Sequence, residues 1–299
     1  MDQLIFAHRG ASGRYAEHTR AAFLQALADG ADGVECDVRL SRDEQPVCIH
    51  DDTLDRTSDG TGDVWDYTVQ ELRAFDFSSW KGAAVPVEYG APSEQFMTLA
   101  DVLDLLAEDG RDIRLAIELK HPSPSGLLLE EKVLELLLAR GFDPAASRLG
   151  AVQVSFMSFS PDSCRRMLEL VPPSAVCQLV ADVEPEQVRE RVAAGPLGMA
   201  ALVHLLRMAV NEGEALLDSG AAGVAGPGVE YVRDHQERIR SWIEAGLVQR
   251  VWTVDSADDL AFLQDLGVQE ITTNHPAEML ALLGRGVSAV RAERAGTEG

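Results

Sequence analysis

Short apolar runs recur along the whole chain, separated by longer segments in which apolar residues return every three or four positions. The short runs have the length and composition of buried strands, and the longer segments have the period of helices. Strands are predicted at residues 4–8, 33–40, 47–50, 115–119, 152–156, 175–180, 223–225, 250–254 and 270–273. Helices are predicted at residues 19–29, 99–108, 127–139, 160–170, 231–245 and 257–266.

Repeated alternation of strands and helices predicts a parallel sheet of the α/β class. With about eight repeats in 299 residues, a closed (β/α)8 TIM barrel is favoured over an open doubly wound sheet. An open sheet would more often show a glycine-rich turn after its first strand, and Gly-x-Gly-x-x-Gly does not follow residues 4–8. We expect a distorted barrel with an insertion after its second strand.

Two intervals are too long for a single connection between strands. The first, about residues 52–113, begins with a polar, turn-rich segment and is expected to form a cap-like insertion over the barrel mouth. The second, from residue 181 to about residue 222, is predicted to be mainly helical. We therefore predict a single TIM-barrel domain over residues 1–284 and a flexible C-terminal tail over residues 285–299.

The net charge restricts the classes of partner. Lys and Arg number 26 against 49 Asp and Glu, a net charge of −23, which disfavours nucleic acid and anionic lipid surfaces. No apolar run is long enough to span a bilayer and no signal-peptide pattern precedes His8, so we expect a cytoplasmic protein without stable membrane association, either a monomer or a homodimer. The cysteines lack C-x-x-C spacing, which favours buried reduced thiols.

Carboxylates gather on two of the predicted strands. Glu35 and Asp37 are one residue apart, and a strand projects residues i and i+2 from the same face. Glu118 and Lys120 repeat this spacing near the end of a later strand, where barrels of this class place their active sites. Neighbouring carboxylates raise one another's pKa unless a cation lies between them. Because the three acids offer only oxygen ligands, they suit Mg²⁺ or Ca²⁺ rather than a structural zinc ion.

Histidines and cations complete this set of candidates. His8 and His50 follow strand-like runs and could transfer protons near neutral pH, one from attacking water and one to a departing alkoxide. Arg9 offers a planar fork for two phosphate oxygens, and Lys120 offers a point charge. Each has a structural alternative, which for Lys120 is a salt bridge that only neutralises a neighbouring acid. Together these residues predict a metal-assisted phosphate-ester site.

These motifs, in this order, resemble those of the glycerophosphodiester phosphodiesterase family. The matching segments are residues 7–11, 16–23, 33–38, 50–57, 117–120 and 251–254, so the resemblance covers almost the whole chain. It implies a distorted TIM barrel that hydrolyses glycerophosphodiesters to glycerol 3-phosphate and an alcohol. The substrate it implies is therefore a small-molecule phosphodiester.

The resemblance also implies a role for each candidate residue. One divalent ion, Mg²⁺ or Ca²⁺, is implied on Glu35, Asp37 and Glu118, with acid–base roles for His8 and His50 and phosphate contacts from Arg9 and Lys120. Glu17 would be an orienting neighbour and Trp252 a wall for the alcohol moiety, the alternative for Trp252 being ordinary core packing. The family suggests that His50 protonates the leaving alcohol and that His8 activates the nucleophile.

Three segments depart from the usual motifs. Ala16-Glu17-His18-Thr19 stands where Pro-Glu-Asn-Thr is usual, Ser158-Phe159-Ser160 replaces Ser-Phe-Asp, and Thr273-Asn274 replaces Thr-Asp. None of these changes removes a predicted ligand or proton carrier, so they bear on substrate preference and pocket geometry. Two other functions stay open: phospholipase D activity on lysophospholipids, and a catalytically silent barrel that binds a phosphorylated ligand. Attack by water or by a neighbouring substrate hydroxyl is also open.

Overall fold

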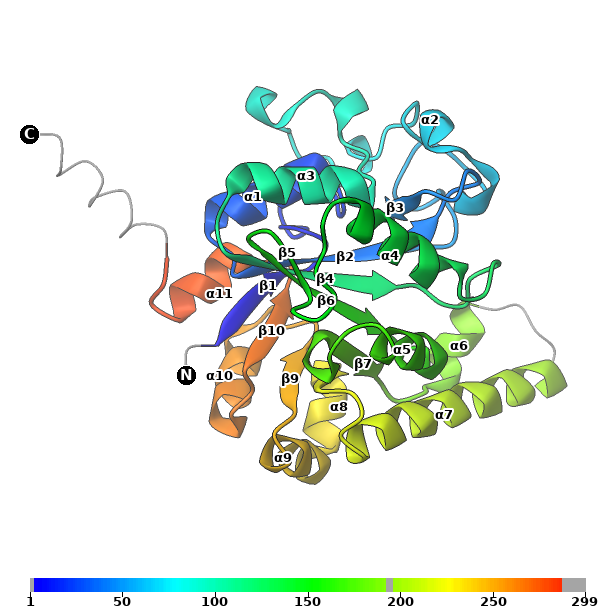
Figure 1. Cartoon of the computed structure of the whole chain (residues 1–299), viewed down its shortest axis with the longest axis vertical. Coiled ribbons are helices and arrows are strands. Elements are labelled where there is room, and N and C mark those ends of the chain that lie inside the picture. The colour runs from blue at the N-terminus through cyan, green and yellow to red at the C-terminus, as the bar shows by residue number, and fades with distance from the viewer. Residues whose placement is uncertain (1–2, 192–195, 287–299) are drawn as a thin grey trace, which may run out of the picture.

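The computed structural model describes residues 3–191 and 196–286. Its centre is a closed ring of parallel strands, with helices packed around the outside (Figure 1). The ring follows the order β1-β10-β9-β8-β7-β6-β4-β2 and closes where β2 pairs with β1. The strands are β1 Leu4–Ala7, β2 Gly33–Leu40, β4 Ile113–Leu119, β6 Val152–Ser158, β7 Val176–Val180, β8 Val224–Pro227, β9 Val248–Val251 and β10 Glu270–Thr273. The predicted (β/α)8 TIM barrel is confirmed.

Two short strands lie outside this ring. β5 (Arg148–Leu149) pairs antiparallel with β6, and β3 (Pro46–Cys48) pairs antiparallel with β2. The predicted strand at residues 47–50 is therefore a hairpin return. β1 ends opposite Val34 of β2, and β3 occupies the same edge of β2 farther along, from Val38 onward. This edge of β2 is therefore unpaired with either strand from Glu35 to Asp37, and we call this stretch the gap on β2.

Helices connect the strands of the ring. The longer ones are α1 Arg20–Asp29, α3 Leu99–Asp109, α4 Leu128–Ala139, α5 Pro161–Leu168, α7 Pro196–Asp218, α9 Gln236–Glu244 and α10 Ala257–Leu266. The shorter ones are α2 Val69–Leu72, α6 Pro185–Arg191, α8 Val229–Asp234 and α11 Pro276–Leu282, with 3-10 turns at Val64–Asp66, Ser79–Lys81, Val87–Tyr89, Pro92–Glu94 and Pro173–Ala175. α6 and α7 occupy the interval that was predicted to be mainly helical.

Local sequence sets several helix ends. The Thr19 hydroxyl accepts a hydrogen bond from Ala22 N and begins α1, and Gly30, in the left-handed region at φ 84°, ends it. Thr98 and Asp101 form a capping box that begins α3. These capping signals lie in the polar segments between apolar runs, and they add to the apolar period from which the helices were predicted.

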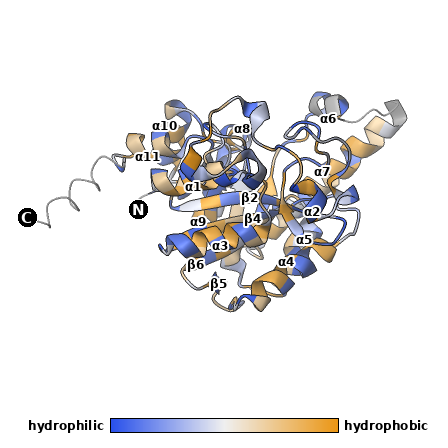
Figure 2. Cartoon of the chain, turned by 90° about the horizontal axis from the view of Figure 1, so that it is seen from above, coloured by the Kyte–Doolittle hydropathy of each residue, from blue (hydrophilic) through white to orange (hydrophobic). Residues whose placement is uncertain are grey.

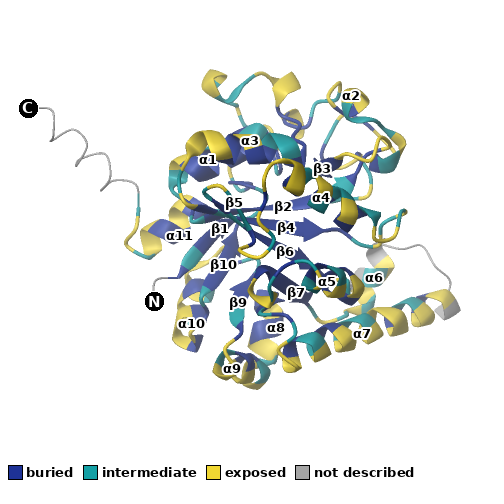
Figure 3. Cartoon of the chain, in the orientation of Figure 1, coloured by how far each residue is buried: buried dark blue, intermediate teal, exposed yellow. Residues whose placement is uncertain are grey.

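Most of the apolar core lies between the strands and the surrounding helices. The strands are buried almost throughout, whereas the helices expose their outer faces (Figure 3). Apolar and polar residues accordingly form separate stripes on helices such as α3 (Figure 2). A smaller apolar cluster inside the ring contains Phe6, Ala116, Met157, Cys177, Leu179 and Val224. All four cysteines are buried and free, as predicted.

The segment between β3 and α3 follows the second barrel strand, as predicted for the insertion. It has its own small core, made of Val47, Ile49, Leu54, Val64, Leu72, Phe77 and Phe96. Helix α3 and the start of β4 belong to the barrel, although they lie within the predicted limits of 52–113. Of the predicted tail, residues 287–299 lie outside the described residues. Within the described ranges, no helix has the length and apolarity needed to cross a membrane.

Candidate active site

Two segments that are distant in the sequence meet at the gap on β2. The backbone N–H of Arg9, which follows β1, donates to Glu35 Oε2 at 2.9 Å. The chain that follows β3 donates a backbone hydrogen bond to the carbonyl of Asp37 at 3.1 Å. His8 and His50 therefore approach the acids of β2 from opposite ends of this gap. His50 comes from a strand outside the parallel ring, which the sequence pattern did not reveal.

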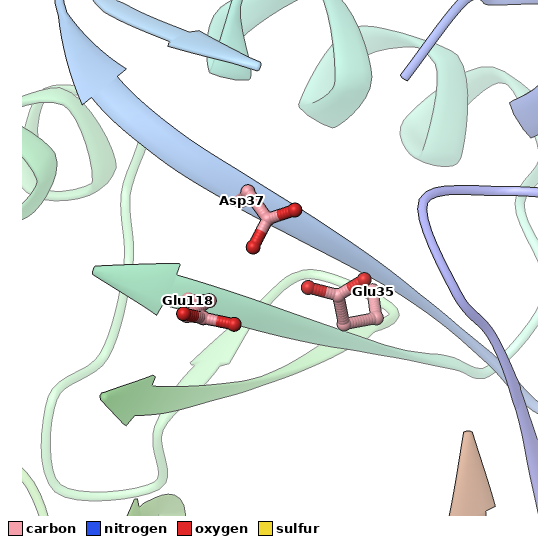
Figure 4. A group of neighbouring side chains, drawn as sticks. All are labelled: Glu35, Asp37 and Glu118. Carbon is pink, nitrogen blue, oxygen red and sulfur yellow. The ribbon is translucent and has the colours of Figure 1, made fainter. Parts of the chain in front are cut away.

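Three carboxyl groups face one another at the mouth of the barrel (Figure 4). Glu35 and Asp37 project from β2 and Glu118 from β4, and one oxygen of each lies within 4.8 Å of the others. The strand register accounts for this, because Asp37 lies directly opposite Glu118. All three side chains are buried. The three predicted metal ligands are thus brought together.

Crowding changes the protonation of these acids. Burial raises the pKa of Glu35 well above its usual value, and the charge of Asp37 raises it further. Burial also raises the pKa of Glu118 to about 7, against the opposing charge of Lys120. For Asp37 burial acts in the same direction, but the charges of Lys120 and Arg9 outweigh it and hold the pKa well below its usual range. The repulsion expected from the sequence is therefore present.

The two predicted phosphate-binding cations lie against the acids. Arg9 Nε is 2.9 Å from Asp37 Oδ2, and Arg9 itself adopts a left-handed backbone conformation with φ 57°. Such a backbone is strained and needs support from its surroundings. Lys120 Nζ lies 2.7 Å from Glu118 Oε1 and 3.4 Å from Asp37 Oδ1. The salt bridge considered as the alternative for Lys120 is thus formed with Glu118.

His8 is held by an amide. Its Nδ1 lies 2.8 Å from Asn274 Oδ1. The amide has a fixed orientation, because its Nδ2 donates to Asp255 at 2.5 Å and the Ser12 hydroxyl donates to its Oδ1 at 2.7 Å. An amide oxygen only accepts, so His8 carries a proton on Nδ1 and keeps a lone pair on Nε2. Burial and the charge of Arg9 lower the pKa of His8 to about 4, which keeps the ring neutral at pH 7.

His50 is held by a carboxylate instead. Its Nδ1 lies 2.6 Å from Asp51 Oδ1, and its backbone carbonyl accepts a hydrogen bond from Arg39 Nε at 3.0 Å. Burial lowers the pKa of His50, while the hydrogen bond to Asp51 works in the opposite direction. A carboxylate partner stabilises the protonated ring more strongly than an amide oxygen does, because it adds a negative charge. The two histidines therefore differ in their readiness to carry a charge.

Glu17 links the two histidine segments. It accepts a hydrogen bond from Arg9 Nη1 at 2.8 Å and two from Arg56, each at 2.8 Å. Arg56 also donates to Asp51, from Nε at 2.6 Å and from Nη2 at 3.1 Å. Glu17, predicted as an orienting neighbour, thus contacts a candidate phosphate ligand directly. Arg56 was not among the predicted site residues.

Comparison with known proteins decides the family. A sequence model described as the glycerophosphoryl diester phosphodiesterase family matches residues 8–278. The chain belongs to this family. The predicted resemblance is therefore confirmed, and the chain is an enzyme of the phosphodiesterase class.

Relatives and solved structures agree with this assignment. The chain is 32% identical over 284 residues to a Mycobacterium tuberculosis protein named "Probable glycerophosphodiester phosphodiesterase 1", with 94% of this chain and 93% of the relative covered. It is 30% identical over 275 residues to the glycerophosphodiester phosphodiesterase of Bacillus subtilis, covering 91% and 84%. A phosphodiesterase from Oleispira antarctica, solved with the product sn-glycerol-3-phosphate, superposes with a TM-score of 0.69 at 22% identity, covering 94% and 96%. This last likeness shows the shared fold.

Two departures from the usual family motifs lie in the site. His18 Nε2 accepts a hydrogen bond from the backbone N–H of Asp37 at 3.0 Å, and its own backbone is left-handed with φ 59°. Histidine is among the residues that tolerate this conformation. Burial lowers the pKa of His18 to about 3, so the ring stays a neutral acceptor. Asn274 is the partner of His8. The motif comparison marked both positions, but nothing in the sequence indicated these contacts.

Trp252 lies just beyond the end of β9, at the same edge of the barrel as the acids. Its Nε1 donates to the Gly226 carbonyl at 2.8 Å. Its ring meets that of Phe159 edge-on, with centroids 5.5 Å apart and planes at 84°. The Phe159 side chain is 40% exposed. An aromatic pair therefore lies just beyond the ends of β6 and β9, two strands that carry none of the acids.

Proposed function

We propose that this chain hydrolyses glycerophosphodiesters to glycerol 3-phosphate and an alcohol, with one divalent cation and two proton-transferring histidines. The buried acid group of Glu35, Asp37 and Glu118 carries this proposal. The product bound to the Oleispira relative supports the choice of substrate class. The net charge of −23 supports a small-molecule substrate over nucleic acid.

The donor atoms suit a hard cation. Within residues 3–191 and 196–286, Glu35 Oε1 is buried and has no hydrogen-bond partner. Both carboxylate oxygens of Asp37 are buried and outside hydrogen-bonding geometry, although Arg9 Nε lies 2.9 Å from Oδ2 and Lys120 Nζ lies 3.4 Å from Oδ1. Buried polar atoms are rarely left this way unless an ion or another ligand satisfies them. All-oxygen donors favour Mg²⁺ or Ca²⁺, and such an ion would polarise the phosphate and neutralise its charge.

Arg9 and Lys120 would bind the phosphate beside these acids. Arg9 offers a guanidinium already oriented by Glu17 at 2.8 Å, and Lys120 offers an ammonium group 2.7 Å from Glu118. Both side chains are mostly buried, with exposed fractions of 16% and 11%. Cationic donors with fixed positions stabilise negative charge that grows on phosphate oxygens in the transition state.

The histidine partners support a division of labour. His8 is neutral and its Nδ1–H donates a hydrogen bond to Asn274. Nε2 therefore keeps a lone pair, and His8 suits the role of general base. His50, paired with the Asp51 carboxylate at 2.6 Å, suits the general acid that protonates the leaving alcohol. This assignment agrees with the one that the family resemblance suggests. The nucleophile activated by His8 is water or a substrate hydroxyl.

The aromatic pair supports a site for the alcohol portion of the substrate. Trp252 and Phe159 present ring faces and edges without any charge, so they suit an uncharged or quaternary-ammonium group rather than the phosphate. We infer that Trp252 forms a wall for this moiety.

A metal-dependent screen tests the proposal. Purified protein treated with a chelator would be assayed with several glycerophosphodiesters and one lysophospholipid, with and without added Mg²⁺ or Ca²⁺. Release of glycerol 3-phosphate that is lost on chelation and restored by either ion is expected. Hydrolysis that persists with the chelator would exclude the metal, and binding without hydrolysis would indicate a silent barrel. Faster hydrolysis of the lysophospholipid would favour the alternative substrate.

A further inference from the structure

Arg56 joins two parts of the site that come from different strands. We propose that Arg56 is a positioning residue whose single guanidinium holds Glu17 and Asp51 together, and through them fixes Arg9 and His50 relative to each other. This inference rests on the proposed function. It assigns Arg56 no contact with the substrate.

The contacts use the fork geometry of arginine. Nη1 and Nη2 each donate to a different oxygen of Glu17 at 2.8 Å. Nε and Nη2 donate to the two oxygens of Asp51 at 2.6 and 3.1 Å. A lysine ammonium is a point charge on a flexible stem and cannot span two carboxylates with paired hydrogen bonds. Charge alone would therefore not replace Arg56.

Each carboxylate that Arg56 holds also forms a hydrogen bond with a proposed catalytic or phosphate-binding side chain, and so helps to fix its position. Glu17 accepts from Arg9 Nη1 at 2.8 Å, and Asp51 contacts His50 Nδ1 at 2.6 Å. Arg9 follows β1, whereas His50 follows β3, and each segment is anchored to β2 separately. In the described part of the chain, no backbone hydrogen bond joins the two segments directly. The guanidinium also lies between two carboxylates that would otherwise repel each other.

The turn that carries Arg56 is itself firmly held. Leu54 is fully buried in the small core of the insertion, and its N–H donates to the Gly62 carbonyl at 2.9 Å. The Leu54 carbonyl accepts from the N–H groups of Thr57 at 3.3 Å and Ser58 at 3.1 Å. These contacts enclose Arg56, whose side chain is nevertheless 45% exposed. Because the turn fixes the backbone of Arg56, its guanidinium can hold the two carboxylates in place although the side chain is partly exposed.

Arg56→Lys is the first test, because it keeps the charge and removes the fork. Mutation of a residue that orients a ligand-binding side chain by hydrogen bonding typically lowers activity by about 10- to 100-fold. We therefore expect kcat/KM to fall by roughly that factor. The fall should be divided between kcat, through His50, and KM, through Arg9. The control is Arg73→Lys, because Arg73 is 43% exposed and pairs with Asp101 in the same part of the chain. It should leave both parameters unchanged.

Two further measurements separate positioning from general destabilisation. Added guanidinium ion should partly restore the activity of Arg56→Ala and should not affect the wild-type enzyme. In a His50→Ala background, Arg56→Lys should lower kcat much less than it does alone, because residues that act through one another are not additive. Wild-type kcat and KM in Arg56→Lys would overturn the inference, as would the same fall in kcat with and without His50. An inactive wild-type enzyme would overturn the proposed function itself.

Discussion

Among the residues that the structure describes, the interior of the barrel contains two groups of buried charged side chains, and one of them has the chemistry of an active site. At Glu270, the first residue of β10, Arg250 Nε donates to the carboxylate at 2.7 Å, and Arg250 Nη1 donates to the Ser155 hydroxyl at 2.9 Å. Glu270 lies opposite Leu4, whereas Glu35 lies one residue beyond Val34, which is opposite Ala7. We call these the lower pair (Arg250 and Glu270) and the upper acids (Glu35, Asp37 and Glu118).

The two groups differ in charge balance. The lower pair combines one cation with one anion in hydrogen-bonding geometry, and the Arg250 guanidinium lies 4.2 Å from the centre of the Phe6 ring. The upper acids outnumber their two adjacent cations and leave buried oxygens without hydrogen bonds in the described part of the chain. Burial of charge therefore does not identify a functional site by itself. Unbalanced charge with unsatisfied oxygens does.

Glu35→Gln should break the upper group with the largest effect. It removes one proposed ligand charge, so turnover should fall on the order of 10⁴-fold, as the loss of several kcal/mol of charge stabilisation implies. Because burial and Asp37 raise the pKa of Glu35, the uncharged amide should also increase the stability of the metal-free protein at pH 7. Turnover and urea unfolding measure the two effects. A fully active variant, or a metal-free one of lower stability, would contradict this account.

His50→Ala should lower turnover by roughly 10²- to 10⁴-fold, as the loss of one proton carrier implies. Metal affinity, measured by calorimetry, should stay at the wild-type value because His50 is not a proposed ligand. The matched control is His235→Ala. His235 also pairs with a carboxylate, Asp182 at 2.9 Å, but it lies between α8 and α9, and neither helix carries one of the acids. Equal losses in the two variants would remove His50 from the mechanism.

Glu270→Gln should have the opposite profile to Glu35→Gln. It leaves Arg250 buried without its counter-charge, and breaking a buried pair in this way costs about 3–5 kcal/mol of unfolding free energy. Turnover per folded molecule should remain close to the wild-type value, because the lower pair neutralises its own charge and Glu270 is not one of the clustered acids. Urea unfolding measures the loss of stability. Turnover at one substrate concentration, divided by the amount of folded protein, measures the effect on catalysis. A stable but inactive variant would mean that the lower pair takes part in the reaction.

The sequence was sufficient for features that depend on local spacing. Apolar runs located the barrel strands, and the i, i+2 rule placed Glu35 and Asp37 on one face of β2. Contacts that depend on loop geometry could not be predicted. β3 returns antiparallel, so His50 reaches the site from outside the ring, and Arg56 meets Glu17 across a sequence separation of 39 residues. The periodicity of apolar residues does not predict contacts between residues so far apart in the sequence.

Glu17 is a second case in which the partners of a buried charge decide its effect, here on stability at low pH. Burial opposes its charged form, but the hydrogen bonds from Arg56 and the charge of Arg9 outweigh burial and lower the pKa of Glu17 from 4.5 to about 2. A lowered pKa gives stability that is complete above about pH 5 and is lost as the pH falls through 4.5 toward 2. A shift of this size corresponds to at most about 3 kcal/mol.

Glu71 provides the comparison, because its pKa is also lowered to about 2, by hydrogen bonds from Thr68 and Arg42. The Glu71 side chain is 48% exposed, whereas that of Glu17 is 11% exposed, so solvent screens the interactions of Glu71. Glu17→Gln should therefore lower stability at pH 7, and part of this deficit should disappear as the pH falls from 5 to 3, while Glu71→Gln should follow the wild type throughout. Urea midpoints between pH 3 and pH 7 provide the measurement. Identical curves for the two variants would show that burial does not decide the contribution of a carboxylate in this protein.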